Sequence, residues 1–173
     1  MLPPSSDSPV GLTHFDEQGG SRMVNTSSKP ETLRWARASA RVRLHPQTAH
    51  TIRRREVAKG DVLAVAQLAA IQAAKQTPFL IPLCHPLPIT SVEVHFHWLG
   101  EDVLHIEACV SCVGRTGVEM EALTAVAVAA LTVYDMCKSL DRTIVIERIQ
   151  LEEKAGGQSG HFLRPSDCLD PNR

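Results

Sequence analysis

The sequence predicts an α+β fold of ferredoxin-like type, a sandwich in which helices pack on one face of an antiparallel sheet. Residues 36–44, 92–98 and 104–110 alternate between apolar and polar, which is typical of strands with one buried face. Two segments rich in Ala, Val and Leu, at residues 62–75 and 116–140, are long enough for helices. The resulting order, with a last strand near the C-terminus, is strand, helices, strand, strand, helix, strand, as in ferredoxin-like sandwiches.

The first predicted strand has an apolar face and a strongly basic one. Apolar residues occupy every second position of residues 36–44, and Arg37, Arg41 and Arg43 lie between them. Because successive side chains of a strand point to opposite faces, the apolar positions are expected in the core.

Turn and cap residues separate the next elements. The polar residues 47–55 favour a short helix and a loop, and Asp61 is expected to cap the helix over residues 62–75. Residues 100–102, Gly-Glu-Asp, join two alternating segments and favour a hairpin.

The longest predicted helix opens with a capping-box spacing. Thr116 and Glu119 have this spacing, and the apolar segment then continues to about Leu140. A β-rich segment over residues 143–151 closes the fold. We expect a disordered tail at residues 1–11, a single domain over 12–163 and a flexible tail over 164–173.

The bulk properties exclude several classes of partner. A chain of 173 residues with a formal charge of −1 and 4% aromatic residues offers no basic or stacking surface for nucleic acid. No apolar run reaches the roughly 20 residues that span a bilayer, and the opening residues lack the pattern of a signal peptide. We therefore expect a cytoplasmic protein with no membrane partner, whose 5 cysteines are reduced thiols.

A rigid Cys-His corner is the first candidate for a functional site. Pro82 and Pro86 bracket Cys84 and His85 between a helix and a strand. Proline fixes φ and removes a backbone donor, so the imidazole is held on a non-helical corner. The alternative is a structural histidine with satisfied hydrogen bonds.

Ionisable residues in the longest helix form the second candidate. Glu121 and Asp135 are fourteen positions apart and return to nearly the same helix face, where Lys138 also lies. The remaining sides are Ala, Val and Leu, so we expect a helix buried almost all round. Buried charges are costly unless they are paired or used. A purely structural Asp135–Lys138 ion pair is the alternative.

Cysteines and histidines elsewhere offer a weak metal hypothesis. Cys109 and Cys112 have CxxC spacing, but a separation of three places them on opposite faces of a strand. His95 and His97 share one strand face, and with the Cys-His corner they would support a zinc-dependent hydrolase. Because that face is the polar one, we expect solvated or interface histidines and no metal site.

Taken together and in order, several segments resemble the molybdenum cofactor biosynthesis protein C family, the cyclic pyranopterin monophosphate synthases. They span nearly the whole chain, which makes the resemblance far more specific than any single motif. The matching segments are residues 12–15, 23–24, 59–61, 81–86, 116–125, 134–138 and 154–157.

The resemblance implies an activity in molybdenum cofactor biosynthesis. The substrate would be a cyclised dihydro-GTP, 3′,8-cyclo-7,8-dihydroguanosine triphosphate, and the products cyclic pyranopterin monophosphate and pyrophosphate. No cofactor is implied. Asp135 and Lys138 would be the catalytic acid/base pair, with both pKa values shifted toward neutrality by burial and proximity. The expected substrate-binding residues are Leu83, Cys84, His85, Met120 and Glu121, with Lys59, Lys154 and Arg34 for the phosphates.

The resemblance also implies a homo-oligomer, a hexamer built as a trimer of dimers. Arg37, Arg41 and Arg43 place more fixed charge on one strand face than a solvent surface requires, which favours an interface. We expect the site to lie between subunits, with cations and His14 supplied by a neighbouring chain.

Two positions and one segment depart from the family pattern. Asn25 stands where the family commonly has Asp, and Gln158 replaces a second lysine of the Gly-rich tail, which puts a phosphate contact from that position in doubt. Residues 51–55 are also more basic than usual. The alternative function is a catalytically inactive nucleotide-binding module of the same fold. The presence of His85, Glu121, Asp135 and Lys138 counts against it.

Overall fold

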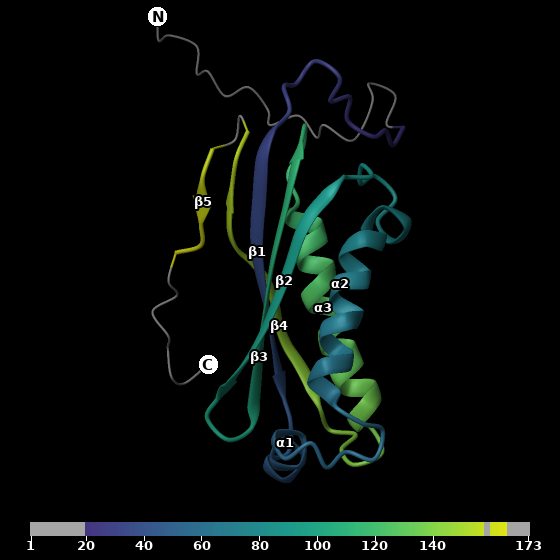
Figure 1. The fold of residues 1–173 in the computed structure, drawn as a ribbon, viewed down its shortest axis with the longest axis vertical. Coiled ribbons are helices and arrows are strands. Elements are labelled where there is room, and N and C mark those ends of the chain that lie inside the picture. The colour runs from purple at the N-terminus through teal and green to yellow at the C-terminus, as the bar shows by residue number, and fades with distance from the viewer. Residues whose placement is uncertain (1–19, 158–159, 166–173) are drawn as a thin grey trace, which may run out of the picture.

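A five-stranded antiparallel sheet, in the order β2-β3-β1-β4-β5, carries two long helices on one face (Figure 1). The computed structural model describes residues 20–157 and 160–165. The predicted α+β class of ferredoxin-like type is confirmed. The elements are β1 (Thr32–Arg43), α1 (Pro46–Arg53), α2 (Val62–Leu80), β2 (Ile89–Leu99), β3 (Val103–Gly114), α3 (Glu119–Cys137), β4 (Val145–Ala155) and β5 (Phe162–Leu163).

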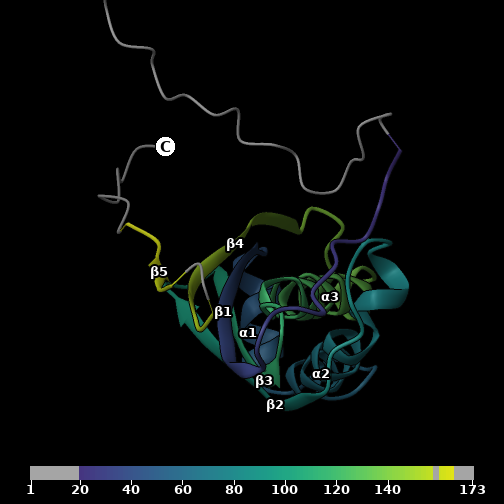
Figure 2. The ribbon, with the colours of Figure 1, turned by 90° about the horizontal axis from the view of Figure 1, so that it is seen from above.

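Small residues in the central strand let the helices approach the sheet closely. Ala36, Ala38 and Ala40 of β1 are fully buried and oppose Val110, Ala108 and Ile106 of β3. Seen from above, α2 and α3 lie side by side on this face (Figure 2). The predicted apolar face of the first strand is therefore confirmed.

Helix α3 is the core helix of the fold. Its length and composition alone would allow it to cross a membrane. However, 56% of its most apolar stretch is buried inside the protein. It packs against β1, β3, β4 and α2, which accounts for its apolar residues.

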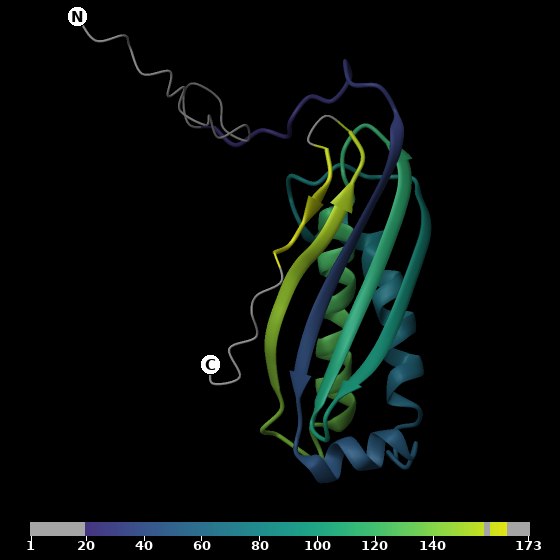
Figure 3. The same cartoon turned by 90° about the vertical axis from the view of Figure 1, so that its left-hand side faces the viewer.

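Within the described residues, no helix lies over the other face of the sheet (Figure 3). Arg37 pairs there with Glu107 at 2.7 Å and Glu153 at 3.2 Å, and Arg43 pairs with Asp102 and Glu147. The charge expected to require a subunit interface is thus largely neutralised within the chain.

Two predicted boundaries were wrong. The capping box does not form: α3 begins at Glu119, and its N-cap, Val118, makes no side-chain hydrogen bond. Helix α2 continues past residue 75 to Leu80, with Pro78 in its last turn. The predicted cap by Asp61 is confirmed, since its carboxylate accepts hydrogen bonds from two N–H groups of the first turn.

The predicted domain bounds stay predictions, because residues 1–19 and 166–173 lie outside the described chain.

Candidate functional site

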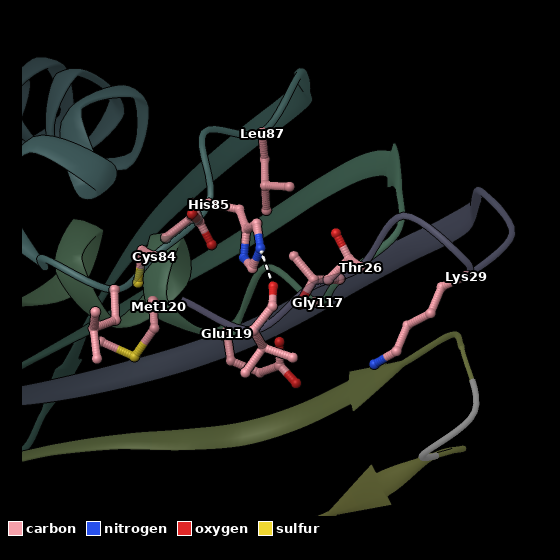
Figure 4. A pocket seen from close by; sticks show the side chains of 12 residues that line it. Thr26, Lys29, Cys84, His85, Leu87, Gly117, Glu119 and Met120 are labelled. Carbon is pink, nitrogen blue, oxygen red and sulfur yellow. Dashed lines mark hydrogen bonds between the residues drawn. The ribbon is translucent and has the colours of Figure 1, made fainter. Parts of the chain in front are cut away.

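A cleft of about 430 Å³ lies beside the N-terminal end of α3 (Figure 4). Its walls come from the segment before β1, the Cys-His corner after α2 and the first turn of α3. Five of the eight residues predicted to bind the substrate line it, namely Leu83, Cys84, His85, Met120 and Glu121. The other lining residues are Val24, Thr26, Lys29, Leu87, Thr116, Gly117 and Glu119.

The ring of His85 is held in place within this cleft. Its Nε2 lies 2.8 Å from the main-chain oxygen of Val24. Because a carbonyl oxygen only accepts, Nε2 carries the proton and donates it, as the dashed line in Figure 4 marks. The histidine is therefore both satisfied and part of the cleft wall, so the structural and functional interpretations describe the same geometry.

Glu121 supplies an acid that can exchange a proton near neutral pH. Only 2% of the residue is exposed. Burial disfavours the carboxylate and raises the pKa of Glu121 to about 7. Burial, and then the nearby Glu121, also raise the pKa of the Cys84 thiol, so Cys84 is a neutral wall residue.

Two lysines bring positive charge to the cleft. Lys154 of β4 places its Nζ 3.7 Å from Oε1 of Glu119, with 15% of its side chain exposed. Lys29 lines the cleft directly from the segment before β1. Sequence reasoning missed Lys29, because a single lysine in a Ser-rich stretch carries no distinguishing pattern.

Arg34 is tied to the backbone around the cleft. It is 7% exposed, and its guanidinium donates to the carbonyl oxygens of Gly114, Arg115 and Gly156 at 3.3, 3.4 and 3.3 Å. These bonds hold the ends of β3 and β4 together. In the single chain, the guanidinium that was predicted to bind phosphate thus donates hydrogen bonds to three carbonyl oxygens.

The predicted catalytic pair lies in a different place, at the C-terminal end of α3. Lys138 Nζ is 2.5 Å from Oδ1 of Asp135, and Lys59 Nζ is 3.7 Å from Oδ2. The side chains of Asp135 and Lys138 are 61% and 52% exposed, so the predicted burial of the pair was wrong. Both side chains face solvent, although Met136 and Cys137 between them in the chain are buried.

The electrostatics of this pair also differ from the expectation. The hydrogen bond from Lys138 lowers the pKa of Asp135, and the same bond raises the pKa of Lys138. Both values move away from neutrality, because opposite charges in contact stabilise each other's ionised form. In the single chain the pair is a carboxylate and an ammonium.

The two groups are too far apart to act together within one chain. Glu121 and Asp135 are fourteen residues apart on α3, and a rise of 1.5 Å per residue separates them by about 21 Å along the helix. The structure therefore brings Leu83, Cys84, His85, Met120 and Glu121 together, with Lys154 and Arg34 close by, and sets Lys59, Asp135 and Lys138 apart.

The residues behind the metal hypothesis do not converge. Cys112 is buried in the core, whereas Cys109 lies on the other face of β3. His95, His97 and His105 stack in a row, with ring centroids 6.4 Å apart. Within residues 20–157 and 160–165, no group of three or more His, Cys, Asp or Glu is placed to hold a metal ion.

Two family-specific residues lie outside the described chain. His14 and Gln158 are not among the described residues, so their expected roles stay predictions. Asn25 is exposed, and its Oδ1 accepts a hydrogen bond from Ser27 N at 2.9 Å, which fixes the turn before β1.

Comparison with known proteins identifies the family. The model of the MoaC family matches residues 23–157. This chain belongs to the MoaC family. It is 57% identical over 153 residues to the cyclic pyranopterin monophosphate synthase of Desulfitobacterium hafniense, covering 88% of this MoaC chain and 94% of the relative. The synthase of Thermomicrobium roseum is 61% identical over 157 residues, with 90% and 95% covered, and cyclic pyranopterin monophosphate synthase 3 of Mycobacterium bovis is 56% identical over 161 residues, with 93% and 91% covered.

Proposed function

We propose that this chain is a cyclic pyranopterin monophosphate synthase of molybdenum cofactor biosynthesis. It would convert cyclised dihydro-GTP into cyclic pyranopterin monophosphate with release of pyrophosphate. The observation that carries the proposal is near-full-length identity of 56–61% to proteins that bear this name. A biosynthetic enzyme of this kind, acting on a small molecule without a bound cofactor, fits a place in the cytoplasm.

The cleft at the N-terminal end of α3 would hold the ring system of the substrate. Leu83 and Met120 give it apolar walls, and His85 and Glu121 give it polar groups. With a pKa near 7, Glu121 can donate a proton or accept one at physiological pH, which is the property that general acid–base catalysis needs. Lys29 and Lys154 would attract the phosphates.

The pair Asp135 and Lys138, with Lys59, would act from a second subunit. A substrate in the cleft of one chain cannot reach a group about 21 Å away along the same helix. An oligomer can bring the C-terminal end of α3 from one chain to the cleft of its neighbour. Contact with that neighbour would also remove water from the exposed ion pair and change its pKa values.

Exposed apolar side chains support association of the chain with copies of itself. On the outer side of the helices, Leu68, Phe79 and Leu131 are 69%, 87% and 57% exposed. Side chains of this size on a surface mark interaction sites. We propose a hexamer built as a trimer of dimers, with each site shared between two chains.

Turnover of the cyclised intermediate by the purified protein tests the activity. We expect cyclic pyranopterin monophosphate and pyrophosphate in equal amounts, both measured by chromatography, without added metal or cofactor. An intermediate that binds but is never converted would identify the protein as an inactive nucleotide-binding module instead.

A further inference from the structure

A second cleft, of about 360 Å³, lies between the start of α2 and the edge strand β2. It is at the end of the molecule where α1 is found, whereas α3 begins at the other end (Figure 1). It shares no residue with the cleft around Glu121 or with the Asp135 group. Its lining residues are Ile52, Arg53, Arg55, Asp61, Leu63, Ala64, Gln67, Phe96 and Trp98.

The first feature of this cleft is an arginine stacked on a tryptophan. The guanidinium carbon of Arg53 lies 4.3 Å from the ring centroid of Trp98. Its Nη2 donates a hydrogen bond to the main-chain oxygen of Gly100 at 2.7 Å. Since the donors of a guanidinium lie in its plane, stacking leaves the others available to an anion.

The second feature is an arginine at a position that favours glycine. Helix α1 ends with bonds from Arg55 N to Ile52 O and from Glu56 N to Thr51 O, and Arg55 has φ 57°. Helix ends of this type favour glycine in the left-handed region, where a side chain is strained. Arg55 is the only non-glycine residue with positive φ among the described residues. Termination of the helix therefore gives no reason for an arginine there.

The side chain of Arg55 faces the cleft and remains accessible. It is 77% exposed, and its Nε lies 3.3 Å from Oδ2 of Asp61. Arg54, between the two cleft arginines, instead pairs with Glu56 at 2.6 Å and does not line the cleft. Of the three consecutive arginines at positions 53–55, Arg53 and Arg55 thus line the cleft and Arg54 does not.

The combination of charges and rings defines the chemistry of a ligand. Two guanidinium groups suit a phosphate, which each can bind through parallel N–H···O bonds. Phe96, Trp98 and Leu63 supply an apolar wall for a flat ring. The volume falls within the range of ligand pockets, roughly 300–1,000 Å³. We propose that this cleft binds a nucleoside monophosphate, with its phosphate at Arg53 and Arg55 and its base against the apolar wall.

Tryptophan fluorescence tests this proposal directly. The chain has 2 tryptophans, so in the Trp35→Phe protein Trp98 is the only one left. Titration of this protein with GMP should change its emission saturably. Guanosine, which lacks the phosphate, should bind more weakly. Emission that does not saturate with GMP would overturn the proposal.

Three arginine variants in the same background provide the matched comparison. Arg53→Ala and Arg55→Ala should each weaken GMP binding about tenfold or more, as expected for a charge-assisted contact. Arg54→Ala removes the same charge outside the cleft and should change affinity less than about twofold. An equal loss with all three would show only general attraction and would contradict the site.

Two further variants separate binding from folding and from the proposed activity. Arg55→Gly suits the left-handed backbone, so it should melt no lower than the parent protein while it binds GMP more weakly. Glu121→Gln should leave the Trp98 response intact. If Glu121→Gln abolishes the change in Trp98 fluorescence, GMP binds in the catalytic cleft and the second site is refuted. If the purified protein fails to turn over the substrate but still shows this change, the proposed activity is refuted and the second site is not.

Discussion

Lys59 is anchored to the main chain of Asp135 rather than to its carboxylate. Its Nζ lies 2.8 Å from the carbonyl oxygen of Asp135 and 3.7 Å from Oδ2. The carbonyl oxygen is present whatever side chain occupies position 135. The loop that carries Lys59 therefore stays attached to α3 when the carboxylate is removed, and the role of the carboxylate can be tested separately.

Replacement of Asp135 by Asn should abolish most of the activity and leave the fold unchanged. Asn keeps the shape of the side chain but cannot exchange a proton, so turnover should fall at least ~100-fold. The thermal unfolding midpoint should stay the same, because the side chain is exposed. Asp102→Asn, which alters an acid on the far side of the sheet, is the control and should turn over normally. Near-normal turnover by Asp135→Asn would refute its catalytic role.

Mixed assemblies should recover activity if the site is shared between chains. Asp135→Asn and Glu121→Gln proteins are each expected to be inactive. When subunits exchange at random, half of the pairs contain one chain of each kind, and one of the two sites in such a pair is intact. Remixed protein should then show about one quarter of the parent activity. Absence of recovery, with exchange of subunits verified by mass spectrometry, would place the whole site within one chain.

Removal of Lys59 or Lys154, the two lysines that the sequence analysis assigns to the phosphates, should weaken substrate binding. Lys59→Ala and Lys154→Ala should raise the Kd for the substrate, and the loss should be larger at low salt, where charges are less screened. Lys75→Ala removes an exposed lysine of α2 and serves as the matched control. Calorimetry at two salt concentrations would show the difference, and unchanged affinity in both test variants would mean that the phosphates bind elsewhere.

Glu121 should make stability depend on pH. Its pKa is about 7 in the folded protein, against an ordinary value of 4.5. The folded state thus holds the proton more tightly than the unfolded state. The contribution of Glu121 is fully present below about pH 4.5 and is lost as pH rises through about 7, up to about 3 kcal/mol.

Glu121→Gln has no such proton, so its advantage over the parent should grow from pH 4.5 to pH 8. Urea unfolding at fixed protein concentration measures this difference. An advantage that is the same at both pH values would show that folding does not raise the pKa of Glu121.

Loss of Arg34 should destabilise the protein. Its guanidinium serves three carbonyl oxygens, and Arg34→Ala would leave them without this donor at a cost of about 3 kcal/mol. Arg41→Ala, on the outer face of the same strand, should cost much less. Urea unfolding compares the two. If Arg34→Ala unfolds like the parent but binds substrate poorly, Arg34 contacts the phosphate as the sequence predicted.

Strand periodicity made the sheet predictable. The alternation along residues 36–44 has only one face that can be buried, so it determined which side of β1 faces the helices. The absence of the capping box could not be predicted from the spacing of Thr116 and Glu119. The side chain of Glu119 lies beside Lys154, which is thirty-five positions away in the chain. The short β5 has too few residues to show any period.

The candidate site was predictable as a set of residues but not as an arrangement. A helical wheel places Glu121 and Asp135 at similar angles and says nothing of their separation along the axis. The same projection made Asp135 look buried, although its side chain faces solvent while Met136 and Cys137 next to it are buried. Lys29 had no pattern that could distinguish it before its position in space was known.

The close packing of Arg34 against the end of β4 limits which residues can be substituted there. A β-carbon at Gly157 would lie 1.5 Å from Nη1 of Arg34, and one at Gly156 would lie 2.2 Å from the carbonyl oxygen of Leu33. Both glycines also have positive φ, at 101° for Gly156 and 76° for Gly157. A mutant library aimed at this cleft should therefore keep both glycines and vary Lys29 and Thr116, which line the cleft.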